Sequence, residues 1–204
     1  MKKLLPFPIM ILTILFASAS CVTIKVAEHR INAGPQHSRF FGDSDSYKHA
    51  YGFQAGLSTG IMDMINRSIC LRAEANISLQ GAGYEDDFGN GPMEGITRLL
   101  YLNVPVLAEY RFENGFFAEA GLQPGFLLSA KDKFEGETYD YKDWVNFFDF
   151  GIPFGFGYQF KNNFGIGLRI IPGLTNINAG EETVSKDRNL VIAIRGSYTF
   201  GKKQ

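Results

Sequence analysis

The sequence contains few of the residues from which most metal and catalytic sites are built. Of 204 residues only 2 are cysteines and 3 are histidines, and the histidines all fall between positions 29 and 49. Two cysteines exclude a disulfide-dense scaffold, and so few histidines leave little material for a histidine-rich metal site. The net charge is -1, so the chain also lacks the basic footprint of a general nucleic-acid binder. We therefore expect no metal, no cofactor and no nucleic-acid partner.

Long apolar runs are also scarce, and the one clear example stands at the N-terminus. Lys2 and Lys3 precede the apolar stretch 4–16, and Ala17-Ser18-Ala19 has the small-residue pattern of a cleavage site. This order is typical of a secretory signal peptide. The stretch contains two prolines and is shorter than the roughly 20 residues that a membrane-spanning helix needs. We expect residues 1–19 to form a signal peptide.

The remaining residues, 20–204, are then expected to form one domain. Cys21 leaves lipid attachment open as an alternative, although Ser18 stands where a lipoprotein signal usually carries a large aliphatic residue. An oxidising compartment would permit a bridge between Cys21 and Cys70, but their strands are expected to be separated by another one. We expect both cysteines to be free or buried.

Glycine and aromatic residues are both abundant. The chain has 23 glycines, and aromatic residues make up 14% of it. Glycine costs roughly 1 kcal/mol in the interior of a helix, so this composition argues against a helical bundle.

Polar and apolar residues alternate along most of the chain. Between Ile69 and Gln80 every odd position is apolar, and the even positions are almost all polar. A period of two is the signature of a β-strand that faces two environments. Eight such runs predict strands over 22–31, 51–62, 69–80, 99–112, 116–128, 147–160, 164–176 and 190–200.

The length and polarity of these runs favour a membrane barrel. Soluble strands usually have about 5–6 residues, whereas tilted strands that cross a bilayer need about 9–11. One face carries bulky aromatic and aliphatic groups that suit lipid, and a sheet in lipid must close because its edges find no water there. The sequence predicts an all-β fold, an eight-stranded antiparallel up-and-down transmembrane β-barrel, in the outer membrane of a Gram-negative bacterium. A mean hydropathy of -0.07 is then the average of two opposite faces.

The predicted connections are short on one side and long on the other, as in porin-like barrels. Short turns are expected at 63–67, 113–115 and 161–163, and long loops at 32–50, 81–98, 129–146 and 177–189. The short turns and both termini are expected to face the periplasm. Eight aromatic residues fall at the strand ends beside the short turns and predict an interfacial girdle: Tyr110, Phe112, Phe116, Tyr158, Phe160, Phe164, Tyr198 and Phe200.

The inward face carries charges of both signs. An eight-stranded barrel is only wide enough for its own side chains, and opposite charges there can satisfy one another. We expect a salt-bridged network that plugs the lumen. Its expected members are Lys25, Arg72, Glu74, Glu109, Arg111, Glu119, Asp149, Arg169 and Arg195.

Several segments resemble the PorT-like outer-membrane β-barrel domain family. They are YLNVPVLAEYRF (101–112), AGLQPGFLLSAK (120–131), DFGIPFGFGYQF (149–160), RIIPGLTNIN (169–178) and the closing Tyr198-Thr199-Phe200. The resemblance covers about residues 50–200 and implies an eight-stranded barrel in the outer membrane. Asn103 and Ala108-Glu109 depart from the family's usual residues, so the resemblance implies no lumen chemistry.

These observations predict a structural or interaction protein that acts through its extracellular loops, with no catalytic residues. Outer-membrane lipid is the expected partner, together with an extracellular or periplasmic protein. The alternatives are a narrow pore for small solutes, a membrane-embedded hydrolase or acyltransferase, and a soluble lipocalin-like binder. The enzyme alternative depends on His29, His37 and His49, but no G-x-S-x-G motif accompanies them.

Overall fold

The computed structural model describes residues 28–43, 47–64, 68–87, 92–179 and 186–200. The predicted signal peptide 1–19 and Cys21 lie outside these residues. The described part contains eleven strands and one short 3-10 helix, η1 (Lys142–Trp144). The strands are β1 (His29–Gly42), β2 (Ala50–Met64), β3 (Ile69–Asp87), β4 (Pro92–Asn103), β5 (Val106–Arg111), β6 (Phe116–Phe134), β7 (Glu137–Asp140), β8 (Phe148–Gly151), β9 (Phe154–Gln159), β10 (Phe164–Pro172) and β11 (Asp187–Phe200).

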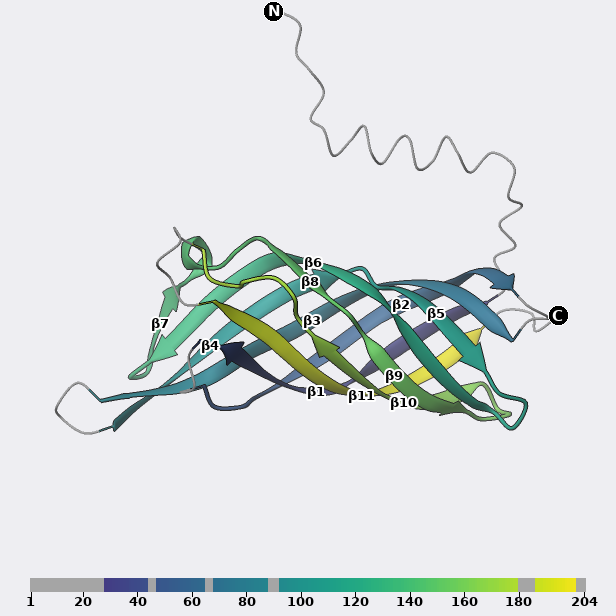
Figure 1. The fold of residues 1–204 in the computed structure, drawn as a ribbon. Helices are drawn as coiled ribbons and strands as arrows, with labels where there is room; N and C mark the ends of the chain where they lie inside the picture. The colour runs from purple at the N-terminus through teal and green to yellow at the C-terminus, as the bar shows by residue number, and fades with distance from the viewer. Residues whose placement is uncertain (1–27, 44–46, 65–67, 88–91, 180–185, 201–204) are drawn as a thin grey trace, which may run out of the picture.

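The strands close into a single ring. Each wall strand pairs with its sequence neighbours, and β1 pairs with β11 to complete the circle. All of these pairings are antiparallel, and β7 pairs only with the end of β6. Because β4 with β5, and β8 with β9, each form one wall strand, the ring has eight strands (Figure 1). The predicted eight-stranded up-and-down barrel is confirmed.

Two prolines divide the wall strands that the sequence predicts as continuous over 99–112 and 147–160. The first break lies at Val104-Pro105 and the second at Ile152-Pro153. Proline has no N–H to give to a neighbouring strand, but its carbonyl still accepts. The carbonyl of Pro105 accepts from the Glu74 amide at 2.9 Å, and that of Pro153 from the Gly121 amide at 3.1 Å. The barrel wall therefore remains bonded across both breaks.

The first strand lies further along the chain than predicted. The expected strand was 22–31 and the expected loop 32–50, but β1 spans His29–Gly42. Its inward residues are mostly polar, and its outward residues include Pro35, two histidines and Arg39. The contrast between the two faces is therefore weak, and hydropathy alone did not reveal the strand.

Two of the predicted long loops are largely strand extensions. β3 and β4 continue as a paired hairpin through most of 81–98, and β6 continues to Phe134 and pairs with β7 within 129–146. Figure 1 shows these extensions beyond the rest of the barrel, at the end opposite the start of β1 and the end of β11. We call the end with the extensions the loop end and the other the short-turn end.

The two faces of the barrel wall are inverted relative to a water-soluble protein. Large apolar side chains face outward, including Phe154 and Phe156 with 53% and 60% of their surface exposed. Arg72 and Arg169 are 0% and 1% exposed on the inner side. This is the arrangement of a barrel whose outer wall contacts lipid. Within the described ranges, no helix is long and apolar enough to cross a membrane.

Candidate functional site

The lumen contains two separate groups of buried ion pairs. The central network consists of Glu74, Glu119, Arg169 and Arg195, from β3, β6, β10 and β11. The mouth network lies at the short-turn end and consists of Glu28, Arg30, Arg72, Glu109 and Arg111.

The central network has balanced charge. Arg169 donates from Nη1 to Glu74 Oε2 at 2.8 Å and from Nε to Glu119 Oε1 at 2.7 Å. Arg195 Nη1 lies 3.0 Å from Glu74 Oε2, and its Nη2 lies 3.6 Å from Glu119 Oε1. Each guanidinium thus contacts both carboxylates. Removing one member would leave a buried charge with too few partners, which is strongly destabilising.

The glycine at position 155 leaves space for this network. A Cβ atom placed there would lie 2.6 Å from Oε1 of Glu119, the same oxygen that accepts from Arg169. Since Glu119 is held by two arginines, it cannot easily move aside. The glycine-rich inner face of β9 is therefore part of what lets the ion pairs fit.

The mouth network carries one more cation than anion. Glu109 accepts from Arg30 at 2.9 Å and from Arg111 at 2.8 Å, and its Oε2 lies 3.4 Å from Nε of Arg72. Glu28 contacts the same three arginines. Arg30 also lies over the ring of Phe117, with its Cζ 5.7 Å from the ring centre, a cation–π contact.

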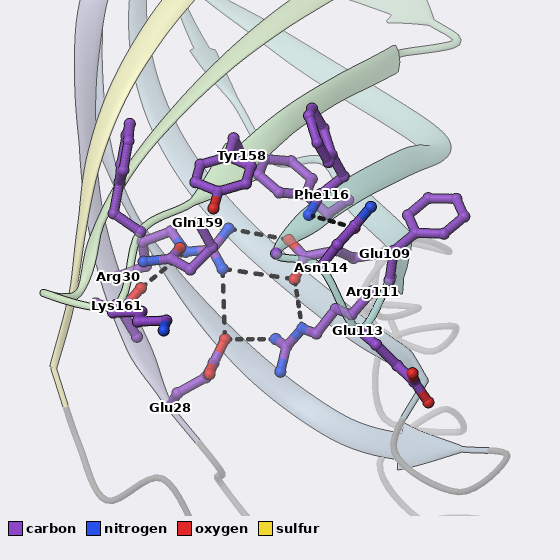
Figure 2. A pocket seen from close by; sticks show the side chains of 15 residues that line it. Glu28, Arg30, Glu109, Arg111, Glu113, Asn114, Phe116, Tyr158, Gln159 and Lys161 are labelled. Atoms are coloured by element: carbon purple, nitrogen blue, oxygen red, sulfur yellow. Dashed lines mark hydrogen bonds and ion pairs between the residues drawn. The ribbon is translucent and has the colours of Figure 1, made fainter.

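A pocket of about 300 Å³ opens beside the mouth network. Its wall combines the ion pairs with the turns after β5 and β9, including Glu113, Asn114 and Lys161. Figure 2 shows Glu28 and Arg111 facing each other, while the Glu113 side chain points away from the cluster. Arg111 is the most exposed member of the network, with 31% of its side chain accessible. The excess positive charge of the network is therefore accessible from the short-turn end through the Arg111 guanidinium.

Asp149 takes a different position from the one predicted. It joins neither network; its carboxylate accepts from Thr175 Oγ1 at 2.5 Å and from Asn189 Nδ2 at 2.8 Å. The alternation of polar and apolar residues assigns a residue to one face of the wall but does not fix its position along the barrel axis. The grouping of Asp149 with the ion pairs was therefore wrong. Asp149 lines a cavity of about 10 Å³ together with Gln123 and Asn189.

The remaining predicted lumen residues divide between the networks, with one exception. Lys25 lies outside the described residues. Glu28 and Arg30 take part instead, and the sequence pattern missed both. The predicted phase, with Val22 and Val26 on one face and Lys25 on the other, would have placed Arg30 on the lipid side. In β1 the even-numbered residues up to position 40, Arg30 among them, are the buried inward ones, which is the opposite phase.

An apolar cap closes the lumen at the loop end. It is one cluster of buried residues, with Tyr47 and Tyr141 packed against it: Phe40, Ala82, Leu99, Tyr101, Leu127, Ala130, Val145 and Ile177. Beside it Asp187, which is 0% exposed, accepts from Tyr47 Oη at 3.2 Å and from Asn178 Nδ2 at 3.0 Å. The sequence analysis missed Asp187 because it falls in the segment predicted as the last loop.

The eight aromatics predicted as a girdle lie at the strand ends beside the short turns. Across neighbouring strands, the ring centres of Phe116 and Tyr158 and those of Phe164 and Tyr198 each lie 5.0 Å apart. Along single wall strands, Tyr110 meets Phe112 at 4.8 Å and Tyr158 meets Phe160 at 4.9 Å. The ring of Phe200 lies 5.8 Å from that of His29, which the sequence analysis did not include. Most of these rings are about half exposed.

The positions of the histidines bear on catalysis. His37 and His49 stack at 4.4 Å between ring centres on the outside of the barrel, and His29 is exposed. Among the described residues, no group of three His, Cys, Asp or Glu side chains is arranged to hold a metal ion. Cys70 is fully buried, and its Sγ donates to the carbonyl of Leu71 at 3.6 Å.

Comparison with known proteins identifies the family. The family model described as outer membrane protein beta-barrel domain matches residues 29–179. Neisserial surface protein A is 14% identical, with a TM-score of 0.53 over 84% of this chain and 97% of that one. Ail of Yersinia pestis is 16% identical (TM-score 0.44, 86% and 99% covered), and OprG of Pseudomonas aeruginosa is 13% identical (0.45, 88% and 98%).

No curated protein matches the chain. The family model nevertheless covers most of it, and the ring of eight antiparallel strands has its apolar face outward. This chain is therefore a small barrel of the cell outer membrane and belongs to the outer membrane protein beta-barrel domain family.

Proposed function

We propose that this barrel does not conduct solutes and acts as an interaction protein through the surface at its loop end. The observation that carries the proposal is the closure of the lumen at three levels: the mouth network, the central network and the apolar cap. A cavity of about 10 Å³ lies beside Gln123, Asp149 and Asn189, and such a volume has room for about one water molecule. A solute would have to displace buried ion pairs to pass.

The surface at the loop end has the features of a binding surface. A groove of about 440 Å³ runs between residues 48–49, the β3–β4 hairpin and the β6–β7 extension. Tyr139 and Trp144 are exposed by 54% and 64% nearby. Aromatic residues are enriched where proteins bind one another. Paired strands hold this surface, so a partner would meet a largely preformed site.

Conductance tests the closed lumen. The full barrel, reconstituted in a planar bilayer, is expected to show no discrete channel steps. The double variant Glu119→Ala/Arg169→Ala should also show no steps, because the mouth network and the apolar cap still close the lumen. Ile194→Ala on the lipid-facing wall should behave like the original chain. Channel steps from the unaltered protein would overturn the proposal.

A pull-down from outer membranes tests the interaction role. We would replace residues 135–147 by a Gly/Ser segment of equal length and compare the captured proteins with those of the unaltered barrel. The control is a replacement in the turn 113–115 at the opposite end. Loss of a specific partner with the first variant only would support the proposal, and identical captures would contradict it.

A narrow pore is the second candidate. The pocket at the mouth network and its partly exposed Arg111 favour it, because an accessible guanidinium attracts small anions. The conductance experiment separates the two candidates, since a pore would show anion-dependent steps that decrease on Arg111→Gln.

We also propose that the protein is not an enzyme. His29, His37 and His49 lie on the outside of the barrel wall, and hydrolysis requires a base within reach of a nucleophile. Histidine-dependent turnover of a lipid or peptide substrate would contradict this.

We also propose an export route and an orientation in the membrane for this chain. Residues 1–19 act as a signal peptide, 20–204 form the barrel domain, and the short-turn end faces the periplasm of a Gram-negative cell. The more specific PorT-like assignment is supported by the order of the four resembling segments along β4 to β10. N-terminal sequencing of the mature protein would test the cleavage site after Ala19.

A further inference from the structure

On four of the eight wall strands, the outward face changes from apolar to basic towards the loop end. Outward-facing residues of β1, β4 with β5, β6 and β11 carry no formal charge from the aromatic girdle to the point of this change. The first charged outward residue on each of these four wall strands is a cation: Arg39, Arg98, Lys131 and Arg188. On β3, by contrast, the first charged outward residue is Glu85, which pairs with Lys48.

These cations stand next to one another in two pairs. Arg98 and Lys131 are direct partners across β4 and β6. Arg39 and Arg188 lie diagonally across β1 and β11, where Arg39 faces Leu190 and Arg188 faces Phe41. Like charges directly opposite each other, as in the Arg98–Lys131 pair, destabilise a sheet. Among the described residues, none of the four forms an ion pair.

The surroundings of the Arg98–Lys131 pair add further donors. Arg98 donates from Nη1 to the backbone carbonyl of Tyr51, whose side chain is 77% exposed. Lys142 reaches the carbonyl of Leu128 at 3.4 Å, and Lys133 follows Lys131 on the same face. Asp140, opposite Lys131 on β7, is the carboxylate that faces this group.

We propose that these two cation pairs bind the phosphate groups of phosphorylated lipids in the outer leaflet. Arginine and lysine donate strong, charge-assisted hydrogen bonds to phosphate oxygens. A lipid fits better than a soluble anion because the apolar wall begins directly below the cations, at Leu100 and Leu128, where acyl chains would lie. The inference rests on the orientation in the proposed function, which places the loop end outside.

Native mass spectrometry of the full barrel in neutral detergent, titrated with diphosphoryl lipid A, tests the proposal. The unaltered protein should bind diphosphoryl lipid A in preference to the dephosphorylated form. Arg98→Gln/Lys131→Gln should lower the apparent affinity about thirtyfold, taking about 1 kcal/mol for each cation at a charged membrane surface. Lys161→Gln at the other end should have no effect, and Arg98→Lys/Lys131→Arg should retain binding.

Three results would overturn the proposal. They are equal binding of the two lipids by the unaltered protein, unchanged affinity in the folded double variant, and full displacement of lipid A by millimolar inorganic phosphate. The last would indicate a site for the free ion. The comparison of the two lipids needs no variant, so it decides even where the double variant fails to fold. Conductance and partner capture do not depend on these cations, so failure here is distinguishable from failure of the proposed function.

Discussion

Arg169 and Glu74, which lie 95 residues apart in the sequence, meet through two parallel hydrogen bonds inside the barrel. Nη1 donates to Oε2 at 2.8 Å and Nη2 to Oε1 at 3.1 Å, and both side chains are only 1% exposed. This contact links β10 to β3 across the lumen, two wall strands that are not neighbours in the ring. The ion pair therefore connects opposite sides of the barrel wall through the lumen.

Loss of the Arg169 charge should strongly destabilise the barrel. Arg169→Met leaves two buried carboxylates with Arg195 as their main partner, and breaking a buried pair in this way costs about 3–5 kcal/mol. Urea unfolding in phosphatidylcholine vesicles, followed by the fluorescence of the single tryptophan, measures the change. Lys161→Met, in an exposed turn, is the control. Adding Glu74→Gln should recover part of the loss, and strictly additive effects would argue against a direct coupling of the two residues.

Two arginines of the mouth network, Arg72 and Arg111, should differ in how much their loss destabilises the barrel. Arg72 is fully buried, whereas Arg111 is partly exposed and belongs to a cluster with one excess cation. Arg72→Gln should therefore cost about 3 kcal/mol or more, and Arg111→Gln about 1 kcal/mol or less. The same urea titration compares them. A larger cost for Arg111 would show that the mouth network depends on its outermost member.

The fold was predictable from the sequence to a greater extent than the lumen was. Alternation gave the faces of strands such as 190–200 because a bulky apolar residue and a polar one differ sharply at every step. It failed for β1, where Pro35 and Arg39 face outward and blur the contrast. Alternation also does not fix the position of a residue along the barrel axis, so Asp149 was grouped with side chains that it does not contact. Ion-pair partners depend on the register between strands, and a single sequence does not contain that information.

A charge on the lipid-facing wall should cost more at mid-height than near the interface. Ile194 and Tyr198 lie on the same face of β11, and both are exposed outward. Ile194→Arg should destabilise the folded barrel by about 2–4 kcal/mol, and Tyr198→Arg by about 1 kcal/mol or less. Unfolding in vesicles measures both variants, and the same comparison in detergent should shrink the difference. Equal costs in vesicles would contradict the position assigned to the girdle.

The segment between β1 and β2 is attached to the β3–β4 hairpin by Lys48. Its Nζ pairs with Glu85 and, at 2.8 Å, with Glu94, and its backbone bonds to Gly83. Hydrogen bonds to Glu85 and Glu94 raise the pKa of Lys48 above its ordinary value of 10.5. A raised folded-state pKa means that the stabilisation is fully present below the ordinary value and is lost as pH rises through the folded value.

We therefore expect Lys48 to titrate at a lower pH once these carboxylates are removed. The measurement is an NMR titration of the barrel after reductive methylation of its lysines with ¹³C. The double variant Glu85→Gln/Glu94→Gln should lower the Lys48 pKa towards 10.5, and Glu137→Gln, on the neighbouring extension, serves as the control. Because the pair is exposed, high salt should reduce the difference between the original chain and the double variant. A Lys48 titration that is the same in all three proteins would show that the carboxylates do not hold this segment against the hairpin.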